Sequence, residues 1–247
     1  MTSQTDYDKY TREELIYLSR LYDKSENYPE MVNCICEFIR LNPRLDLSER
    51  NILSAGFKNV ISNKRFSWRY LQNLINKDTN QTTIGYINEI KLRIEKEMKE
   101  ICKRITSLLD NLILPNENNI ENRVHYLKMK ADYYRYQCEF LKDEELSSFC
   151  DLAYKIYQEA YLLAEENLPI SSTSRIGTAL NYSVFLYEVQ NNVEEACRIA
   201  KNAINEGIKI LDDLERNKQK DTILIIQLLT ENLMLWNSDD KDEEMGD

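Results

Sequence analysis

The stretch from Arg50 to Lys77 begins Arg50-Asn-Ile-Leu-Ser-Ala-Gly-Phe-Lys58-Asn-Val-Ile-Ser-Asn-Lys64-Arg65-Phe-Ser-Trp68-Arg69 and continues to Lys77 without an acidic residue. Its apolar residues recur at the spacing of one helix face: Ile52, Leu53, Phe57, Val60, Ile61, Trp68, Leu71 and Leu74. The stretch is therefore predicted to form one long amphipathic helix.

The same helix concentrates six positive charges in a chain whose formal net charge is -10. At about 100° per residue, Lys58, Arg65 and Arg69 fall within roughly 40° of one another. No carboxylate lies one turn away from them along the helix, so the helix itself does not neutralise the stripe. Such a stripe either faces water, as most charge runs do, or binds a confined anion.

Composition predicts an all-α fold around this helix. The 247 residues include only 5 Gly and 4 Pro, and long runs of helical periodicity dominate the chain. No internal boundary is marked, so a single helical domain is predicted for residues 1–238. Residues 239–247 carry six acids and one lysine, and we expect them to form a disordered acidic tail.

Several function classes are disfavoured. A pI of about 4.9 argues against nucleic acid or an anionic membrane as partner, because both require broad positive charge. The single histidine, His125, and the absence of a glycine-rich phosphate loop indicate no enzyme. The six cysteines lie in helical patterns without metal-binding spacing, so no metal or cofactor is expected. With neither a signal peptide nor a membrane-spanning run in view, we expect a cytoplasmic or nuclear protein.

The apolar periodicity predicts nine helices in all. They are expected at about 12–26, 29–40, 50–77, 84–114, 120–142, 145–167, after the loop at 171–174, 193–211 and 220–237. All four prolines fall at predicted boundaries, where proline is tolerated.

The long basic helix resembles the signature of the 14-3-3 family. The family's Arg-Asn-Leu-Leu-Ser, Tyr-Lys-Asn-Val and Arg-Arg-x-Ser-Trp-Arg match Arg50–Ser54, Phe57–Val60 and Lys64–Arg69 in order and spacing. Three further blocks resemble family motifs: Tyr126–Tyr136, Arg175–Glu188 and Leu228–Trp236. One departure is Thr173, which stands where family members usually carry proline before the arginine of the second of these blocks.

The resemblance implies nine antiparallel helices that form a cup-shaped groove for client proteins phosphorylated on serine or threonine. A phosphate group suits two arginines, a further cation and a hydroxyl. By resemblance, the phosphate-binding residues are Lys58, Arg65, Arg135 and Tyr136. The residues expected to contact the rest of the peptide are Lys128, Leu180, Asn181, Val184, Glu188, Leu228, Asn232, Leu235 and Trp236.

The resemblance also implies a homodimer that forms through the first helices. The residues expected at its interface are Leu15, Leu21, Tyr22, Tyr28, Glu30, Met31 and Arg93. Glu30 and Arg93 would keep one ion pair between subunits, and two other family pairs are lost. Exposed ion pairs contribute roughly 0–1 kcal/mol each, less than apolar burial, so a homodimer with altered geometry is expected.

One alternative belongs to another class of binding protein. Nine helices with short connections also suit a TPR-like scaffold, which would bind unmodified peptides independently of phosphate. Dependence on phosphate separates the two hypotheses.

Overall fold

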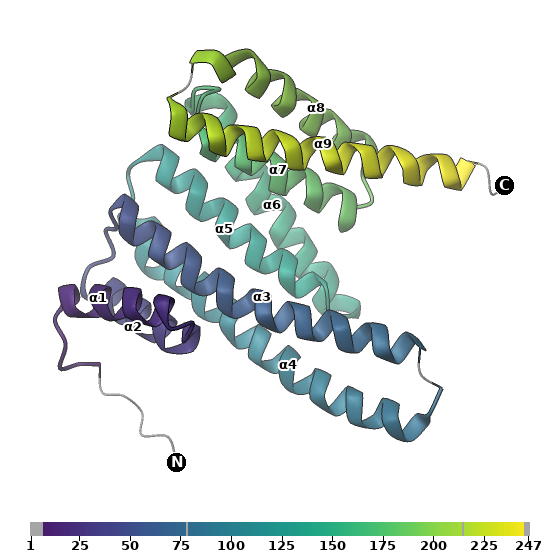
Figure 1. Cartoon of the computed structure of the whole chain (residues 1–247), viewed down its shortest axis with the longest axis horizontal. Coiled ribbons are helices and arrows are strands. Elements are labelled where there is room, and N and C mark those ends of the chain that lie inside the picture. The colour runs from purple at the N-terminus through teal and green to yellow at the C-terminus, as the bar shows by residue number, and fades with distance from the viewer. Residues whose placement is uncertain (1–6, 78, 214, 245–247) are drawn as a thin grey trace. The chain divides into compact units, whose positions relative to one another are not determined.

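The computed structural model describes residues 7–77, 79–213 and 215–244, and the regular structure of these residues is helical throughout (Figure 1). The predicted all-α class is confirmed. Contacts divide the chain into two compact units, residues 1–117 and 118–247. The cup-shaped groove and the single domain over residues 1–238 stay predictions. None of the helices, within the described ranges, is long and apolar enough to cross a membrane.

In its described residues, the first unit contains four α-helices and two short helical turns. They are α1 Arg12–Lys24, α2 Tyr28–Leu41, α3 Leu47–Lys77, α4 Gln81–Leu108, a π-helical turn Leu109–Ile113 and a 3-10 turn Leu114–Asn116. α1 packs on α2, and the long helices α3 and α4 lie side by side (Figure 1). The hydroxyl of Thr11 accepts a bond from the Glu14 N–H, and the Glu14 carboxylate accepts one from the Thr11 N–H. This reciprocal capping explains where α1 begins.

The fourth helix is shorter than its sequence pattern indicates. The pattern predicts a helix from about 84 to 114, whereas the α-helical part ends at Leu108 and the chain continues as a π turn and a 3-10 turn. Pro115 cannot donate an α-helical hydrogen bond, and its ring clashes with the carbonyl of residue 111. The regular α-helix therefore stops before it reaches the proline.

Two contacts fix α3 against its neighbours in the first unit. Arg12 at the start of α1 forms two short hydrogen bonds to the carboxylate of Glu49 on α3, of 2.7 and 2.8 Å. Gly56 on α3 lies so close to α2 that an added Cβ would be 2.5 Å from Cδ1 of Ile35. The helix that carries the basic stripe is thus held by an ion pair at one point and by close packing at another.

The second unit contains five α-helices within residues 118–213 and 215–244. They are α5 Ile120–Cys138, α6 Asp143–Asn167, α7 Thr173–Glu188, α8 Val193–Ile210, a 3-10 turn Leu211–Asp213 and α9 Arg216–Glu244. α5 and α6 form a hairpin, and α7 contacts α5, α6, α8 and α9. α7 therefore positions the helices that carry the predicted peptide contacts in this unit.

Two ends in this unit differ from the predicted ones. α5 ends at Cys138 rather than near residue 142, and Asp143, with φ of 50°, begins α6. The backbone of α9 continues to Glu244, past the predicted end near 237 and into the predicted acidic tail. The sequence between Trp236 and Glu244 holds no proline or glycine to stop the helix. The last tail residues, 245–247, lie outside the described residues.

Candidate functional site

α3 presents two of the four predicted phosphate-binding residues. Lys58 is exposed and Arg65 is half-buried, and seven residues separate them, so they lie on one helix face. Within the described part of the chain, the Lys58 ammonium makes no hydrogen bond or ion pair. Its charge is available to an external anion.

α4 supplies acidic partners that the α3 sequence does not reveal. Nζ of Lys64 lies 2.5 Å from a carboxylate oxygen of Glu97, and Nε1–H of Trp68 donates to Glu95 over 2.8 Å. Lys91, also on α4, lies over the Trp68 ring at 4.8 Å from its centroid. One of the six α3 cations, Lys64, is therefore neutralised from the neighbouring helix, and Lys64 is not among the predicted phosphate-binding residues.

Asp132 on α5 is the centre of a buried polar cluster in the second unit. Its carboxylate accepts bonds from Lys128 at 3.1 Å and from the Asn181 amide at 2.8 and 2.9 Å to its two oxygens. The Tyr157 hydroxyl donates to the same carboxylate. A guanidinium nitrogen of Arg135 lies 3.6 Å from it. With 6% of its surface exposed, Asp132 is nearly enclosed by these partners.

The cluster also stabilises the charged forms of Asp132 and Arg135. Burial by itself would raise the pKa of Asp132, but the charges of Lys128 and Arg135 and the Tyr157 hydrogen bond lower it overall. Burial likewise opposes the charge of Arg135, yet Tyr157 and Asp132 raise the pKa of its guanidinium well above the usual value. Asp132 is therefore an anion and Arg135 a cation at neutral pH.

Arg135 is positioned from three helices of its unit. Its Nε–H donates to the Tyr157 hydroxyl on α6 over 3.1 Å, and Nη1 lies 3.7 Å from the Glu188 carboxylate on α7. On α5 itself, its guanidinium carbon lies 4.9 Å from the centroid of the Tyr136 ring. Two predicted phosphate-binding residues, Arg135 and Tyr136, are thus in contact, with the predicted peptide residue Glu188 beside them.

α7 and α9 place apolar side chains in the same unit. Leu180 and Val184 are half-buried on α7, one turn apart and next to Asn181. On α9, Leu228 and Leu235 are 41% and 61% exposed, with half-buried Asn232 between them. Leu224 lies one turn before Leu228 and is also exposed, so it extends the row of exposed leucines on α9. It is not among the predicted peptide-contacting residues. The i, i+4 spacing of leucines 224 and 228 was the available signal.

Trp236 has a different environment. It is 5% exposed, and its ring is stacked on Tyr187 of α7 with 4.8 Å between centroids. In this structure it packs α9 against α7, and a direct contact with a peptide stays a prediction.

The predicted dimer residues divide into buried and exposed groups. Leu15 and Met31 are both 1% exposed and belong to the core of the first unit, whereas Leu21 is 46% exposed. Tyr22 and Tyr28 are half-buried. Glu30 accepts hydrogen bonds from Tyr7 and Asn33, and Arg93 pairs with Glu89 on its own helix. A pair between Glu30 and Arg93 across subunits stays a prediction.

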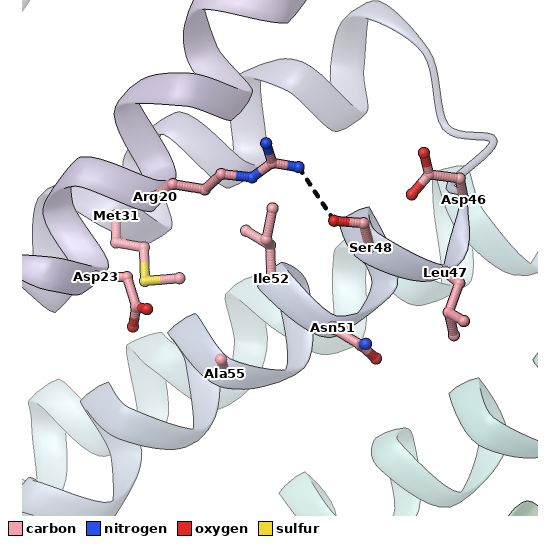
Figure 2. Close-up of a pocket in the computed structure, with 9 residues that line it drawn as sticks. All are labelled: Arg20, Asp23, Met31, Asp46, Leu47, Ser48, Asn51, Ile52 and Ala55. Carbon is pink, nitrogen blue, oxygen red and sulfur yellow. Dashed lines mark hydrogen bonds between the residues drawn. The ribbon is translucent and has the colours of Figure 1, made fainter. Parts of the chain in front are cut away.

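A hollow of about 670 Å³ opens between α1, α2 and the start of α3 (Figure 2). Arg20 reaches from α1 to Ser48, where Nη2–H donates to the hydroxyl over 3.1 Å. Met31 and Ile52 contribute apolar surface to its wall. Met31 is one of the predicted dimer residues, and none of the predicted phosphate-binding residues lines this hollow.

Comparisons with known proteins agree with the sequence motifs. The family model described as 14-3-3 protein matches residues 18–237. The chain is 41% identical over 231 residues to 14-3-3 protein 8 of Solanum lycopersicum, covering 92% of this chain and 88% of that protein. It is also 41% identical over 231 residues to 14-3-3-like protein C of Glycine max, covering 92% and 90%. Membership of this family supports, in general, an adaptor role with binding of client proteins and dimer formation. The chain belongs to the 14-3-3 family.

Proposed function

We propose that this protein is an adaptor that recognises client proteins through motifs phosphorylated on serine or threonine and alters their activity, location or assembly. The observation that carries the proposal is the buried cluster around Asp132. This cluster holds the guanidinium of Arg135 in one place and keeps it charged. Family membership supports the same function.

The proposed phosphate-binding residues are Lys58, Arg65, Arg135 and Tyr136. A phosphoserine carries close to two negative charges and three acceptor oxygens, which match guanidinium, ammonium and hydroxyl donors. Arg135 is already ordered by Asp132 and Tyr157, so binding an anion would immobilise little further side-chain motion. Lys58 has no partner within the described residues that a phosphate would have to displace.

The rest of the peptide would contact polar and apolar groups of the second unit. Asn181 and Asn232 carry amides that can bind the backbone of an extended peptide, and Lys128 and Glu188 add charge. The Asn181 nitrogen already donates to both oxygens of Asp132, which leaves its carbonyl oxygen as acceptor. Leu180, Val184, Leu228 and Leu235 would form an apolar wall.

Replacing Lys58 with glutamate tests the proposal. Charge-assisted hydrogen bonds contribute on the order of 1.5–3 kcal/mol each, so affinity for a phosphopeptide should fall at least tenfold. The measurement is fluorescence polarisation with paired phosphorylated and unmodified peptides. Lys155→Glu is the matched control, because Lys155 is an exposed α6 lysine and the change in net charge is identical. If wild type bound both peptides equally, the TPR-like scaffold would be the better hypothesis.

We also propose that the protein is a homodimer in which α1 contributes to the interface. Leu21 is the predicted interface residue with the most exposed apolar surface on that helix, at 46%. Leu21→Glu should therefore shift the protein from dimer to monomer at micromolar concentration, as measured by sedimentation. Leu162→Glu is the control, since Leu162 is 50% exposed in the second unit. A monomeric wild type at that concentration would contradict the proposal.

A further inference from the structure

Two of the six cysteines are in direct contact at the hairpin between α5 and α6. Cys138 is the last residue of α5, and Cys150 lies two turns into α6. The Cys150 thiol donates to the sulfur of Cys138 over 3.1 Å, and the Cys138 thiol donates to the Tyr134 carbonyl over 3.5 Å. Both are free thiols. The contact therefore joins two reactive groups that are 12 residues apart in the chain.

The other four thiols have a different environment. Cys34, Cys36, Cys102 and Cys197 are buried, whereas Cys138 and Cys150 are half-buried. Cys34 and Cys36 are two residues apart on one helix, so their side chains point in different directions. Cys138 and Cys150 are thus both close to each other and partly accessible to solvent.

The pair also lines an open hollow. This hollow measures about 260 Å³, and its wall includes both cysteines, Arg135, Leu146 and Glu188. A small oxidant can reach the sulfurs through such a space, whereas it cannot enter the packed core around the buried thiols. We infer that Cys138 and Cys150 form a redox modification site at which a hydroperoxide produces a reversible intramolecular disulfide.

The geometry requires little movement for this bond. A disulfide places its sulfurs about 2.0 Å apart, so the two atoms must approach by about 1 Å. Cys138 is followed by the non-helical residues 139–142, which connect α5 to α6. We expect rotation of the two side chains, together with a small adjustment of this connection, to bring the sulfurs together.

The chemistry balances with one peroxide for each pair of thiols. With hydrogen peroxide, the Cys150 thiol loses its proton and its sulfur attacks a peroxide oxygen, so that an S–O bond forms, the O–O bond breaks and the leaving hydroxide takes up that proton as water. The Cys138 sulfur then attacks Cys150, the S–S bond forms, and the S–O bond breaks. The departing hydroxide takes the Cys138 proton as a second water. Two electrons pass from the thiols to the peroxide, and a small dithiol reverses the reaction by exchange.

The surroundings assign the order of the two sulfurs. The Cys138 thiol donates its proton to the Tyr134 carbonyl over 3.5 Å, a contact that favours the protonated form, and burial raises the pKa of the same thiol. Cys138 therefore keeps its proton until its sulfur attacks Cys150. This makes Cys150 the sulfur oxidised first and Cys138 the one that resolves it.

Peptide mapping of the wild-type full chain tests the inference directly. The protein is exposed to hydrogen peroxide, denatured and alkylated, and its peptides are identified by mass spectrometry. Alkylatable thiols should fall from six to four, with a cross-linked peptide containing Cys138 and Cys150, and dithiothreitol should restore all six. Six remaining thiols, or a bond that joins other cysteines, would overturn the inference.

Single variants then test the order of attack. Cys138→Ser should leave a sulfenic acid on Cys150 that dimedone traps, whereas Cys150→Ser should leave Cys138 at least tenfold less labelled. Cys197→Ser, in the same unit, is the matched control and should still form the bond. Equal trapping at both sulfurs would overturn the assigned order, and loss of the bond in Cys197→Ser would overturn the pairing.

Discussion

Replacing Asp132 with alanine is expected to lower the free energy of unfolding by roughly 3–5 kcal/mol, the range for removing one partner of a buried ion pair. The change leaves Lys128 and Arg135, whose side chains are 20% and 12% exposed, without their common anion. It also leaves the Asn181 amide without its acceptor. Phosphopeptide affinity should fall with stability, because Arg135 would no longer be held in place.

The same variant has a defined pH dependence. The pKa of Asp132 is lowered in the folded state, so its contribution is fully present above the unfolded-state value of about 3.9. That contribution is lost as pH falls through the lower, folded-state value. The stability difference between wild type and Asp132→Ala should therefore be constant from pH 7 to 5 and shrink below about pH 4.

Urea unfolding at several pH values measures both effects. Asp151→Ala is the matched control, since Asp151 is an exposed aspartate on α6. Surface substitutions of this kind usually change stability by less than about 0.5 kcal/mol. If the two variants lost similar stability at pH 7, the Asp132 cluster would not have the structural importance assigned to it.

The second large effect is expected in the first unit, at the pair between Arg12 and Glu49. Arg12→Ala should lower the free energy of unfolding by roughly 3 kcal/mol, near the low end for buried pairs because Arg12 is 20% exposed. Glu49, 7% exposed in the wild type, would lose its arginine and keep, among the described residues, the bond from the Asp46 N–H at 3.0 Å. The pair joins α1 to α3, so the loss should appear as a lower urea midpoint with early melting of α1.

Arg20→Ala provides the control on the same helix. Arg20 is exposed and donates to the Ser48 hydroxyl across the open hollow, so its loss should change stability by less than about 1 kcal/mol. Because neither arginine is a proposed peptide contact, phosphopeptide affinity measured well below the melting temperature should stay near wild type in both variants. Equal destabilisation by the two changes would contradict the role of the Arg12–Glu49 pair.

Local periodicity and proline positions were sufficient to predict the helices. Pro29 lies in the first turn of α2 and Pro43 follows its end, and the apolar spacing runs along most of α3, so the order and approximate bounds of these helices followed from local sequence. The residues at which the helices end were less predictable. α5 ends at Cys138, four residues before the predicted end, and neither this end nor the positive φ of Asp143 at the start of α6 has a marker in the apolar pattern.

The partners of site residues could not be read from one helix at a time. No acid lies within one turn of the basic stripe along α3, yet across the helix pair Glu97 of α4 neutralises the neighbouring cation Lys64. The side-chain amide of Asn181 was predicted to contact a peptide. Only the folded structure shows that its nitrogen already donates hydrogen bonds to Asp132. Both contacts join residues on different helices, and the pattern within one helix does not show which residues of another helix lie opposite it.

The Asp132 carboxylate has four partners, and this sharing makes their energies interdependent. Lys128, Arg135, Tyr157 and Asn181 all act on one anion, so each single substitution is measured against the three partners that remain. Changes at residues in one such network do not add, and coupling energies of roughly 0.5–3 kcal/mol are typical. The affinity of an Arg135 variant therefore depends on which residues occupy the other three positions, so substitutions that are tolerated together at this cluster can each be damaging alone.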